Sequence, residues 1–502
     1  MSAVGEPSVT FDRGLVELFA EASNDRNPLH TRGEYARATA YGEPVVFGVL
    51  AALALLGRMR GVVTDPVRRL TASFRQPVFV GVEYEVVVTG TGDHRRGELR
   101  RAGQRVVTVA VRGGDPTDPA DPVAGEPAPP TPMRAEPARW TVEDLLPGTT
   151  VDGGYRTTRF AELVTRLGLG DGPLPAAHLA ALLWSSYLVG MEVPGRQALF
   201  TRVTMDFHEE RMTGTCSYRA EVRRVDPRFR LVELTGRVLF GRRTVASAMI
   251  QALVRPPVTP VALAGPPREV DALPTLEGRV AVVVGASRGL GAALALVLAR
   301  RGCTVVGCYR DCETEAARLE RAAPGGLLRL ERGDAADPEF CARLAGEVAT
   351  RHGRVDLLVC SAAPALRPLR LLAGAAGELA DHVADTVRLV ATPVAAFLPL
   401  LDRAEGQVVA VSSRALSAPP AQWPHYVAAK GAVEHLVHAL GPANPRLRFL
   451  ICRPRRMDTA YVDSVTDDHP AAAPLVVATE LVDAIGRFAD RPVRGRVPVL
   501  EV

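Results

Sequence analysis

Three side chains in the C-terminal part of the chain have the types and spacing needed for proton transfer to an oxygen atom. They are Ser413, Tyr426 and Lys430, in the segment AVSSRALSAPPAQWPHYVAAKGAVEHL. Tyr426 and Lys430 are four residues apart, so they share one face if the segment is helical. A nearby ammonium group lowers the pKa of a phenol, which predicts that Tyr426 exchanges a proton with a substrate oxygen held by Ser413.

Composition singles out Lys430. The chain has 60 lysine and arginine residues, and Lys430 is the only lysine. A bias toward GC-rich codons explains the arginines without any function. Pairs of the form Tyr-x-x-x-Lys are common on solvated helix faces. Lysine, however, is a compact ammonium with a tunable pKa, and its retention at this one position favours the catalytic interpretation.

A glycine-rich turn lies upstream of these residues, in the run RVAVVVGASRGLGAALALVLARRG. Gly285, Gly289 and Gly291 follow an apolar strand pattern and open a helical one, an order that lets helix amides approach a pyrophosphate. A tight turn with close helix packing is the alternative for an isolated glycine trio. The next strand pattern ends in Arg310, where an NAD site usually has an acid. Arg310 and Arg288 suit a 2′-phosphate, which predicts NADP(H).

A second set of polar residues lies near the N-terminus. Asp25, Asn27 and His30 fall in one short stretch ahead of an apolar helix pattern that begins near Gly48. A carboxylate and an imidazole that converge on one water molecule can add or remove the elements of water across two carbons. The Gly48 amide, at a helix N-terminus, is predicted to stabilise an enolate oxygen. The alternative is a simple turn at Asn27 with Asp25 as a local cap.

Two proline-rich stretches divide the elements that must position these residues. Residues 115–138 carry eight prolines, and a further six fall between Pro256 and Pro274. Such segments are typical of stiff linkers. The predicted domains are therefore residues 1–114, 139–255 and 276–502, joined by linkers at 115–138 and 256–275.

The three segments have different patterns. The first two each contain an apolar helix pattern, at 46–58 and 176–189, followed by strands rich in Val, Thr and Phe. The third alternates strands at 280–285, 304–309, 355–360, 407–412 and 447–452 with helices. Alternation of this kind indicates a parallel sheet built from βαβ units. The predicted class is a multi-domain α+β and α/β protein, with a helix wrapped by antiparallel sheet, twice, before a doubly wound parallel sheet.

Composition excludes several classes of protein. A chain of 502 residues with 47% hydrophobic and 23% charged residues is a folded protein of about three domains. The longest apolar run, Val45 to Leu56, is shorter than the ~20 residues of a membrane span, and no signal sequence is visible, so we expect a cytoplasmic protein with no membrane partner. A net charge of +4 without a basic block gives no support for nucleic-acid binding. The seven cysteines form no CxxC pair, and no metal site is predicted.

The third segment resembles the short-chain dehydrogenase/reductase family over nearly its whole length. The resemblance rests on the glycine turn, on Asp334, on the thirteen-residue step from Ser413 to Tyr426, and on Lys430. It implies a Rossmann-type fold in which Tyr426 donates the proton, Ser413 orients the carbonyl, and Lys430 contacts the nicotinamide ribose. The implied contacts to NADP(H) are Gly285, Ser287, Arg288, Gly289, Leu290, Gly291, Arg310, Asp334, Tyr426 and Lys430.

This segment also departs from the family pattern. Val284 precedes the first glycine where threonine is usual, and CSAA at 360–363 replaces NNAG. Thr386 falls near the usual helix asparagine, and Arg455 follows Pro454 where glycine is usual. The loss of the asparagine puts a water-mediated proton relay to Lys430 in doubt.

The first segment resembles the MaoC-like (R)-specific enoyl hydratases, which have the hot-dog fold. The shared residues are Asp25, Asn27, Pro28, His30, Tyr35, Ala36 and Pro44. Phe47 stands where the family usually has a histidine before Gly48. The resemblance implies Asp25 and His30 as the catalytic pair, with Asn27 and Gly48 at the substrate. The second segment has a similar helix without this cluster and is predicted to be a degenerate hot-dog that completes the sheet.

The two predicted chemistries share a 3-hydroxyacyl thioester. We therefore expect a ketoreductase and dehydratase that act on acyl carrier protein or CoA thioesters in polyketide or fatty-acid-like synthesis, in company with a ketosynthase. One alternative reverses the flow, as enoyl-CoA hydratase and 3-hydroxyacyl-CoA dehydrogenase of β-oxidation. Another is a non-catalytic acyl-binding scaffold, which Phe47, Thr386 and Arg455 would favour. By resemblance to short-chain reductases we also expect a homodimer.

Overall fold

A computed structural model describes most of the chain. The described residues are 8–37, 39, 41–59, 63, 66–91, 94–114, 132–170, 172, 174–208, 215–256, 270, 273–367, 369, 371, 375–457, 471–489 and 497–502. Most of the two predicted linkers, at 115–131 and 257–272 apart from Val270, lies outside this range. The chain divides into two compact units. Among the described residues, one unit holds those up to Ala36 and from Glu43 to 256, and the other holds Arg37–Gly42 and the residues from Val270 onward. Each unit is described by itself.

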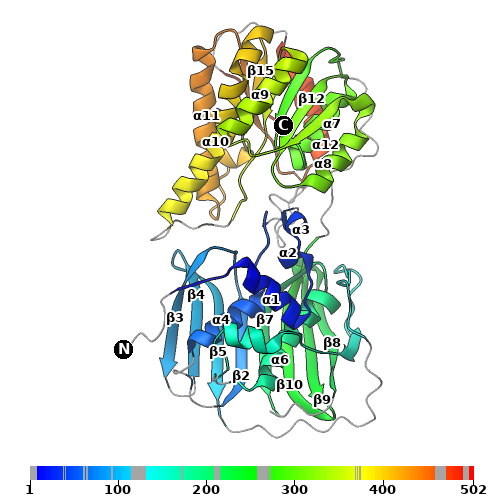
Figure 1. The fold of residues 1–502 in the computed structure, drawn as a ribbon, viewed down its shortest axis with the longest axis vertical. Helices are drawn as coiled ribbons and strands as arrows, with labels where there is room; N and C mark the ends of the chain where they lie inside the picture. Colours follow the sequence, from blue (N-terminus) through cyan, green and yellow to red (C-terminus); the bar gives the residue numbers. More distant parts are fainter. Residues whose placement is uncertain are drawn as a thin grey trace. The chain divides into compact units, whose positions relative to one another are not determined.

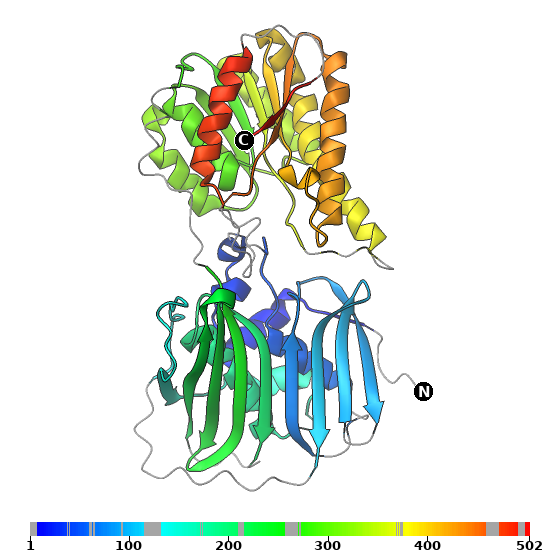
Figure 2. The ribbon, with the colours of Figure 1, turned by 180° about the vertical axis from the view of Figure 1, so that it is seen from behind.

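The N-terminal unit is built on one ten-stranded antiparallel sheet, whose far face is seen in Figure 2. Its order is β1-β3-β4-β5-β2-β7-β10-β9-β8-β6, so the first five strands along the chain mirror the last five about the β2–β7 pair. The strands are β1 (Ser8–Thr10), β2 (Val67–Phe74), β3 (Glu83–Thr91), β4 (His94–Arg101), β5 (Gln104–Gly113), β6 (Thr150–Gly154), β7 (Ala198–Phe207), β8 (Cys216–Asp226), β9 (Leu231–Phe240) and β10 (Arg243–Val254).

The β2–β7 pair joins the two halves into one sheet. Residues 69–73 of β2 pair with 202–206 of β7. At the end of this ladder Arg69 donates to Asp206 over 2.5 Å, and Thr71 and Thr204 share a hydrogen bond of 3.2 Å. The predicted double hot-dog with a continuous sheet is confirmed, because each half supplies five strands and one long apolar helix.

The helices of this unit lie on one face of the sheet (Figure 1). The two long apolar ones, α4 (Gly48–Met59) and α6 (Ala176–Tyr187), contact each other and the central strands. Both are apolar on nearly every side, as expected for helices buried all round. The others are α1 (Arg13–Ser23), α2 (Pro28–Thr31), α3 (Gly33–Arg37), α5 (Phe160–Arg166) and the 3-10 turn η2 (Pro227–Phe229).

The second helix differs from its sequence prediction at the C-terminal end. The α-helical pattern stops at Tyr187 and continues as a π-helix, η1, over Leu188–Glu192. The amide of Val193 closes the wider turn by donating to the Leu188 carbonyl over 2.9 Å. Such π-turns are often found at functional sites, and this one lies against a predicted catalytic residue, as described below.

The C-terminal unit is a seven-stranded, fully parallel sheet of order β13-β12-β11-β14-β15-β16-β17. This confirms the predicted doubly wound Rossmann-type fold. The strands are β11 (Val280–Val284), β12 (Thr304–Tyr309), β13 (Leu328–Arg332), β14 (Leu357–Cys360), β15 (Gln407–Val411), β16 (Arg448–Arg453) and β17 (Val499–Glu501). The central strands β11, β14 and β15 are buried along their whole length, as strands covered on both faces must be.

Two apolar cores lie on the two faces of this sheet. Helices α7 (Gly289–Arg300), α8 (Glu313–Ala322) and α12 (Pro474–Ala489) pack on one face, and α9 (Pro338–His352), α10 (Ala376–Ala404) and α11 (Pro424–Ala443) on the other (Figure 1). Short 3-10 turns are η4 (Pro324–Gly326) and η5 (Arg414–Leu416). Among the described residues, α10 alone has the length and composition of a membrane span, and here it packs against α9 and α11.

The buried central helix of the N-terminal unit gives a stability prediction. Leu50 lies on α4 and is fully buried. We expect Leu50→Ala to lower the free energy of unfolding of this unit by about 2–5 kcal/mol, because it removes packed methyl groups and leaves a cavity. Chemical denaturation followed by tryptophan fluorescence checks this, since Trp140 and Trp184 lie in the unit. Exposed Leu146→Ala is the control, with an expected change within about 0.5 kcal/mol, and equal effects of the two variants would contradict the assignment.

Candidate functional site

The glycine turn of the C-terminal unit joins β11 to α7 and has no room for side chains. Gly285 and Gly289 have φ values of 84° and 57°, which favour glycine. A Cβ atom on Gly285 would lie 2.8 Å from the backbone of Ala362, and one on Gly291 would lie 2.1 Å from the Gly285 carbonyl oxygen. Arg288 is the N-cap of α7 and makes no side-chain cap. The turn therefore fits a pyrophosphate, with close backbone approach and uncapped helix amides.

The other predicted dinucleotide contacts lie around the same turn. Ser287 lies within it, and Leu290 is buried in the first turn of α7. Arg310 follows β12 and donates to Asp311 over 2.7 Å, with Asp334 at 3.8 Å. Its side chain remains 65% exposed, so several N–H groups of the guanidinium stay accessible to a phosphate. Two carboxylates nevertheless share this cation, which the sequence analysis did not anticipate.

The predicted proton donor and the lysine lie together on α11. Lys430 Nζ is 5.8 Å from the centre of the Tyr426 ring and donates to the Val411 carbonyl oxygen over 2.8 Å. Ser413 ends the neighbouring loop after β15, and its Oγ accepts from the Ala415 amide over 3.1 Å. A hydrogen bond between Ser413 and Tyr426 lowers the pKa of the Tyr426 phenol. The fold thus brings all three predicted residues into one cluster.

The pKa of Tyr426 differs from the sequence prediction. Burial raises the pKa of the phenol above its usual value, and only the hydrogen bond with Ser413 lowers it. The predicted lowering of this pKa by Lys430 is not seen in the protein alone, where burial raises the pKa and the ammonium donates to the Val411 carbonyl oxygen. Burial also lowers the pKa of Lys430 to about 8. An arginine could not respond in this way, since its pKa stays above ~12.

A buried ion pair between Glu434 and Arg453 lies next to this cluster. Glu434 lies one helical turn after Lys430 and accepts two hydrogen bonds from Arg453, at 2.7 and 2.8 Å. Its Oε1 also accepts from Ser412 Oγ over 2.5 Å. These bonds tie α11 to the ends of β15 and β16. The negative charge of Glu434 also raises the pKa of Lys430, because it favours the charged ammonium.

The position expected for a helix asparagine holds a threonine that is already bonded. Thr386 is buried on α10, and its hydroxyl donates to the His382 carbonyl oxygen over 2.7 Å. His382 itself lies against His425, with ring centres 4.5 Å apart. Burial, His425 and Lys430 together lower the pKa of His382 to about 4. His382 and His425 thus form a pair of histidines on this side of the site, and the sequence analysis singled out neither.

The N-terminal unit buries the carboxylate of Asp25. The side chain is 3% exposed, and its Oδ2 accepts from Ser186 Oγ over 2.7 Å. Gly190, in the π-turn, approaches so closely that a Cβ there would lie 2.2 Å from Asp25 Oδ1. Both partners belong to the second half of the sheet, which the sequence analysis treated as degenerate. That half completes the environment of Asp25, although it has no acid–base cluster of its own.

Asn27 and His30 are held by the same local structure. Asn27 is the N-cap of α2, accepting from the Leu29 amide, and its Nδ2 donates to the carbonyl oxygens of Gly190 and Gly195 at 3.3 and 2.9 Å. His30 Nδ1 lies 2.7 Å from the Val45 carbonyl oxygen. A carbonyl only accepts, so this bond places the proton on Nδ1 and leaves Nε2 as the basic nitrogen. Asn27 therefore caps a helix and also bridges the two halves.

The residue that replaces a family histidine has a packing role. Phe47 stacks on His30 with ring centres 3.9 Å apart and touches Phe19 at 4.8 Å. It precedes Gly48, where α4 begins, and a Cβ on Gly48 would lie 2.9 Å from the Phe74 ring. No acceptor among the described residues takes the Gly48 N–H, which keeps this amide available as predicted.

Burial sets the protonation states in this site. It raises the pKa of Asp25 to about 7, against the opposing effects of the hydrogen bonds from Ser186 and Asn27. It lowers the pKa of His30 to about 4, with a contribution from the positive charge of Arg255. At neutral pH the imidazole is therefore uncharged, and the carboxyl group is partly protonated. With these two pKa values, neutral His30 can act as the base and protonated Asp25 as the acid.

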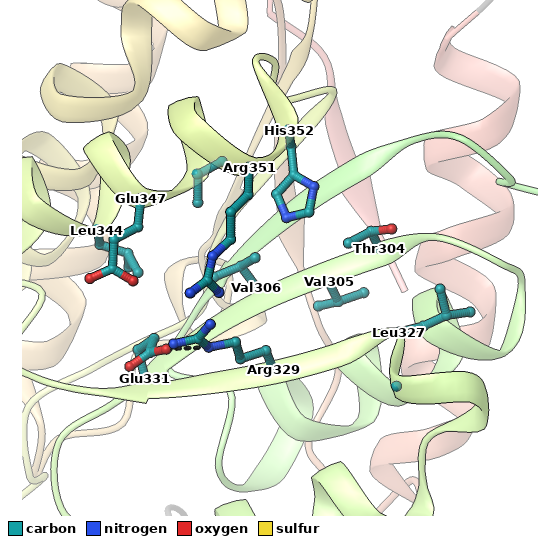
Figure 3. Close-up of a pocket in the computed structure, with 12 residues that line it drawn as sticks. Thr304, Val305, Val306, Leu327, Arg329, Glu331, Leu344, Glu347, Arg351 and His352 are labelled. Atoms are coloured by element: carbon teal, nitrogen blue, oxygen red, sulfur yellow. Dashed lines mark hydrogen bonds and ion pairs between the residues drawn. The ribbon is translucent and has the colours of Figure 1, made fainter.

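A groove of about 180 Å³ lies elsewhere, between α9 and strands β12 and β13 (Figure 3). Arg329 and Glu331 of β13 form an ion pair at its floor, and Arg351 and His352 project from α9. Thr304 is the first residue of β12, so the groove lies toward the amino ends of the strands. Dinucleotides bind at the carboxyl ends of such sheets, and the groove is no part of the cofactor site.

Comparison with known protein families matches both units. Residues 279–469 match the short chain dehydrogenase family, and residues 2–111 match the MaoC like domain. An uncharacterized oxidoreductase of Mycobacterium tuberculosis is 30% identical over 210 residues, which are 41% of this chain and 80% of that protein. An NADPH-dependent pterin aldehyde reductase of Arabidopsis thaliana is 33% identical over 170 residues, which are 32% of this chain and 67% of the relative.

Among solved structures, an alcohol dehydrogenase of Thermococcus sibiricus complexed with 5-hydroxy-NADP is 27% identical, with a TM-score of 0.39, and the match covers 45% of this chain and 95% of that one. The sequence matches agree with the parallel sheet, the glycine turn and the Ser413–Tyr426–Lys430 cluster. The chain belongs to the short-chain dehydrogenase/reductase family through its C-terminal unit and carries a MaoC-like domain in its N-terminal unit, so it is an oxidoreductase fused to a MaoC-like dehydratase.

Proposed function

We propose that the chain reduces a 3-oxoacyl thioester with NADPH and then dehydrates the 3-hydroxyacyl product to the trans-2-enoyl thioester. The observation that carries this proposal is the presence of two acid–base sites in one chain, Tyr426 with Lys430 and Asp25 with His30, whose expected chemistries share the 3-hydroxyacyl intermediate. The NADPH dependence named for the Arabidopsis relative supports the choice of cofactor, as does the exposed guanidinium of Arg310.

In the reduction, the glycine turn and Arg310 would hold NADPH, which would supply the hydride. Ser413 holds the carbonyl oxygen of the substrate by a hydrogen bond, and the Tyr426 hydroxyl gives its proton to the same oxygen. Lys430 stabilises the phenolate that is left, because its charge lies on the same helix face. The ion pair between Glu434 and Arg453 holds α11 against β16, next to the strand that leads into Ser413. The product is a secondary alcohol.

In the dehydration, Nε2 of neutral His30 removes a proton from the carbon next to the thioester. The Gly48 amide stabilises the enolate oxygen that forms. Protonated Asp25 then gives its proton to the leaving hydroxyl group, which departs as water. His30 ends charged and Asp25 ionised, and transfer of one proton between them restores the starting state. The raised pKa of Asp25 and the lowered pKa of His30 favour the resting state, with a protonated carboxyl group and a neutral imidazole, and they favour the return of the proton from His30 to Asp25 after each turnover.

The wider setting is also part of the proposal. The substrate is carried by acyl carrier protein or CoA, and a ketosynthase of a polyketide or fatty-acid-like pathway supplies the 3-oxoacyl group. The protein acts in the cytoplasm as a homodimer. The presence of both acid–base sites in one chain, together with the 3-hydroxyacyl intermediate that their chemistries share, is what supports reduction followed by dehydration.

The reductase assignment predicts the effect of Tyr426→Phe. With NADPH and a 3-oxoacyl thioester, the natural protein should yield an enoyl product by mass spectrometry. The variant should lose at least about 10²-fold in reduction rate, because no other group donates the proton. It should still dehydrate added 3-hydroxyacyl thioester, which shows that the protein remains folded. Full reduction by the variant would rule out Tyr426 as the donor.

The dehydratase assignment predicts that His30→Ala loses dehydration and keeps reduction. This variant should consume NADPH at the normal rate and accumulate the 3-hydroxyacyl thioester. Its dehydration rate should fall by about 10²- to 10⁴-fold, since the alanine has no base. Mass spectrometry of the thioester pool distinguishes the two products. Undiminished formation of the enoyl product would count against the Asp25 and His30 site.

The order of the pKa values predicts a pH profile. Only protonated Asp25 acts as the acid, and its pKa is raised to about 7. We therefore expect kcat/KM for dehydration to be level below this pH, down to the pKa of His30 at about 4, and to fall about tenfold per unit above it. Initial rates with 3-hydroxyacyl thioester between pH 5 and 9 give the profile. A rate that rises through neutral pH would mean that ionised Asp25 is the active form.

A further inference from the structure

Two arginines of the N-terminal unit lie around one tyrosine without a carboxylate partner. Tyr35 is on α3, Arg196 follows the π-turn, and Arg255 comes directly after β10. The Cζ atoms of Arg196 and Arg255 lie 4.7 and 5.8 Å from the centre of the Tyr35 ring. Among the residues that the structure describes, no Asp or Glu lies within ion-pair distance of either guanidinium.

Backbone and hydroxyl groups fix the inner arginine. Arg255 Nη2 donates to the Arg196 carbonyl oxygen over 2.9 Å and to the Tyr35 hydroxyl over 3.4 Å. The Arg255 amide donates to the Gln197 carbonyl oxygen over 2.8 Å. Arg255 is 6% exposed, and its Nε has no hydrogen-bond acceptor in the described part of the chain. Its polar head is thus held in place while one donor remains unused.

A buried guanidinium without an anion is costly, because its hydration is lost and nothing replaces it. A second cation beside the same ring adds repulsion. Some arginines of this unit pair with carboxylates, for example Arg159 with both Glu21 and Glu162. Arg255 is instead buried with an Nε that has no acceptor in the described part of the chain, and a bound anion would offset its charge.

The location restricts which anion fits. Arg255 is close enough to His30 for its charge to contribute to the lowered pKa of that imidazole. Arg196 is only half-buried, so the pair extends from the catalytic histidine toward solvent. The reacting acyl carbons must lie at His30 and Asp25, in apolar surroundings. The charged part of the ligand therefore belongs to the carrier side of the thioester. Guanidinium forks match the geometry of phosphate oxygens.

We propose that Arg196 and Arg255, with Tyr35 between them, bind the phosphate of a phosphopantetheine arm that delivers the thioester to Asp25 and His30. The inference rests on the proposed dehydratase function for the identity of the ligand. CoA and acyl carrier protein both contain this phosphate, so the site accepts either carrier. The proposed site also sets the direction of the phosphopantetheine arm, with its phosphate at the half-buried Arg196 and its thioester at His30.

Two thioesters that differ only in this phosphate test the proposal. They are (R)-3-hydroxybutyryl-4′-phosphopantetheine and (R)-3-hydroxybutyryl-pantetheine. The natural protein should favour the phosphorylated thioester by at least about tenfold in kcat/KM, and this preference should fall to near unity in Arg196→Gln and Arg255→Gln. Added salt should weaken the preference, since it screens the partly exposed Arg196. Arg223→Gln is the control, because Arg223 is an exposed arginine of β8.

Binding measurements separate this proposal from the dehydratase assignment. Free 4′-phosphopantetheine should bind the natural protein by calorimetry, and at least about tenfold more weakly after Arg196→Gln, with pantetheine as the phosphate-free comparison. Arg196 is half-buried, so its variant is informative even if Arg255→Gln fails to fold. Equal binding of the two compounds overturns the phosphate site, whether or not the protein is a dehydratase. Phosphate-dependent binding without turnover supports the site and refutes the dehydratase function.

A comparison of carriers identifies the source of the phosphate. The same thioester on CoA and on acyl carrier protein should show the same loss of kcat/KM in Arg196→Gln, since both present the pantetheine phosphate. A loss confined to CoA would mean that Arg196 contacts the 3′-phosphate or the pyrophosphate of the nucleotide, and it would overturn the proposed position of the arm.

Discussion

The hydrogen bond from Ser186 to Asp25 connects two segments that are 161 residues apart, and the N-terminal site depends on it. Asp25 is buried beneath a helix and π-turn of the other half of the sheet, where Gly190 leaves space for the carboxylate. This contact requires the halves to be joined in one register, which the β2–β7 ladder provides. Loss of water raises the Asp25 pKa far enough for a carboxyl group to act as an acid near neutral pH. The half without catalytic residues is thus needed for the chemistry of the other.

Burial also shifts a pKa in the C-terminal unit, where the buried group is a cation instead of a carboxylate. Burial lowers the pKa of Lys430 to about 8, and Glu434 opposes this by favouring the charged form. A protein that otherwise uses only arginine keeps a lysine here because the ammonium can be held near its titration point, which a guanidinium cannot. Tyr426, buried beside it, has a raised pKa in the protein alone. Burial thus disfavours the charged form of both side chains, the phenolate of Tyr426 and the ammonium of Lys430.

Much of this arrangement could be predicted from sequence because it is local. The glycine turn, the i, i+4 spacing of Tyr426 and Lys430, and the apolar helices are patterns within short segments, and both folds follow from them. Ser186, Gly190 and Arg255 could not be found in this way, because their importance comes from contacts across the sheet. The signal available for Arg255 was weak, since it is one arginine among many. Likewise, the Tyr426 pKa depends on burial and on the hydrogen bond with Ser413, and the spacing of Tyr426 and Lys430 gives neither.

The departures from the family patterns are integrated into the packing, which bears on whether the protein is a catalyst or a scaffold. Phe47 stacks directly on His30 and so fixes the ring that the missing histidine would have neighboured. Arg455, where glycine is usual, makes two hydrogen bonds to Glu480 at 2.6 and 2.8 Å. Thr386 bonds to its own helix, with His382 one turn away and close enough to Lys430 to be influenced by its charge. A site that had lost its function would be expected to lose its costly buried groups first, since an unused Asp25 or Lys430 only destabilises the fold. Their retention within completed hydrogen-bond networks favours catalysis.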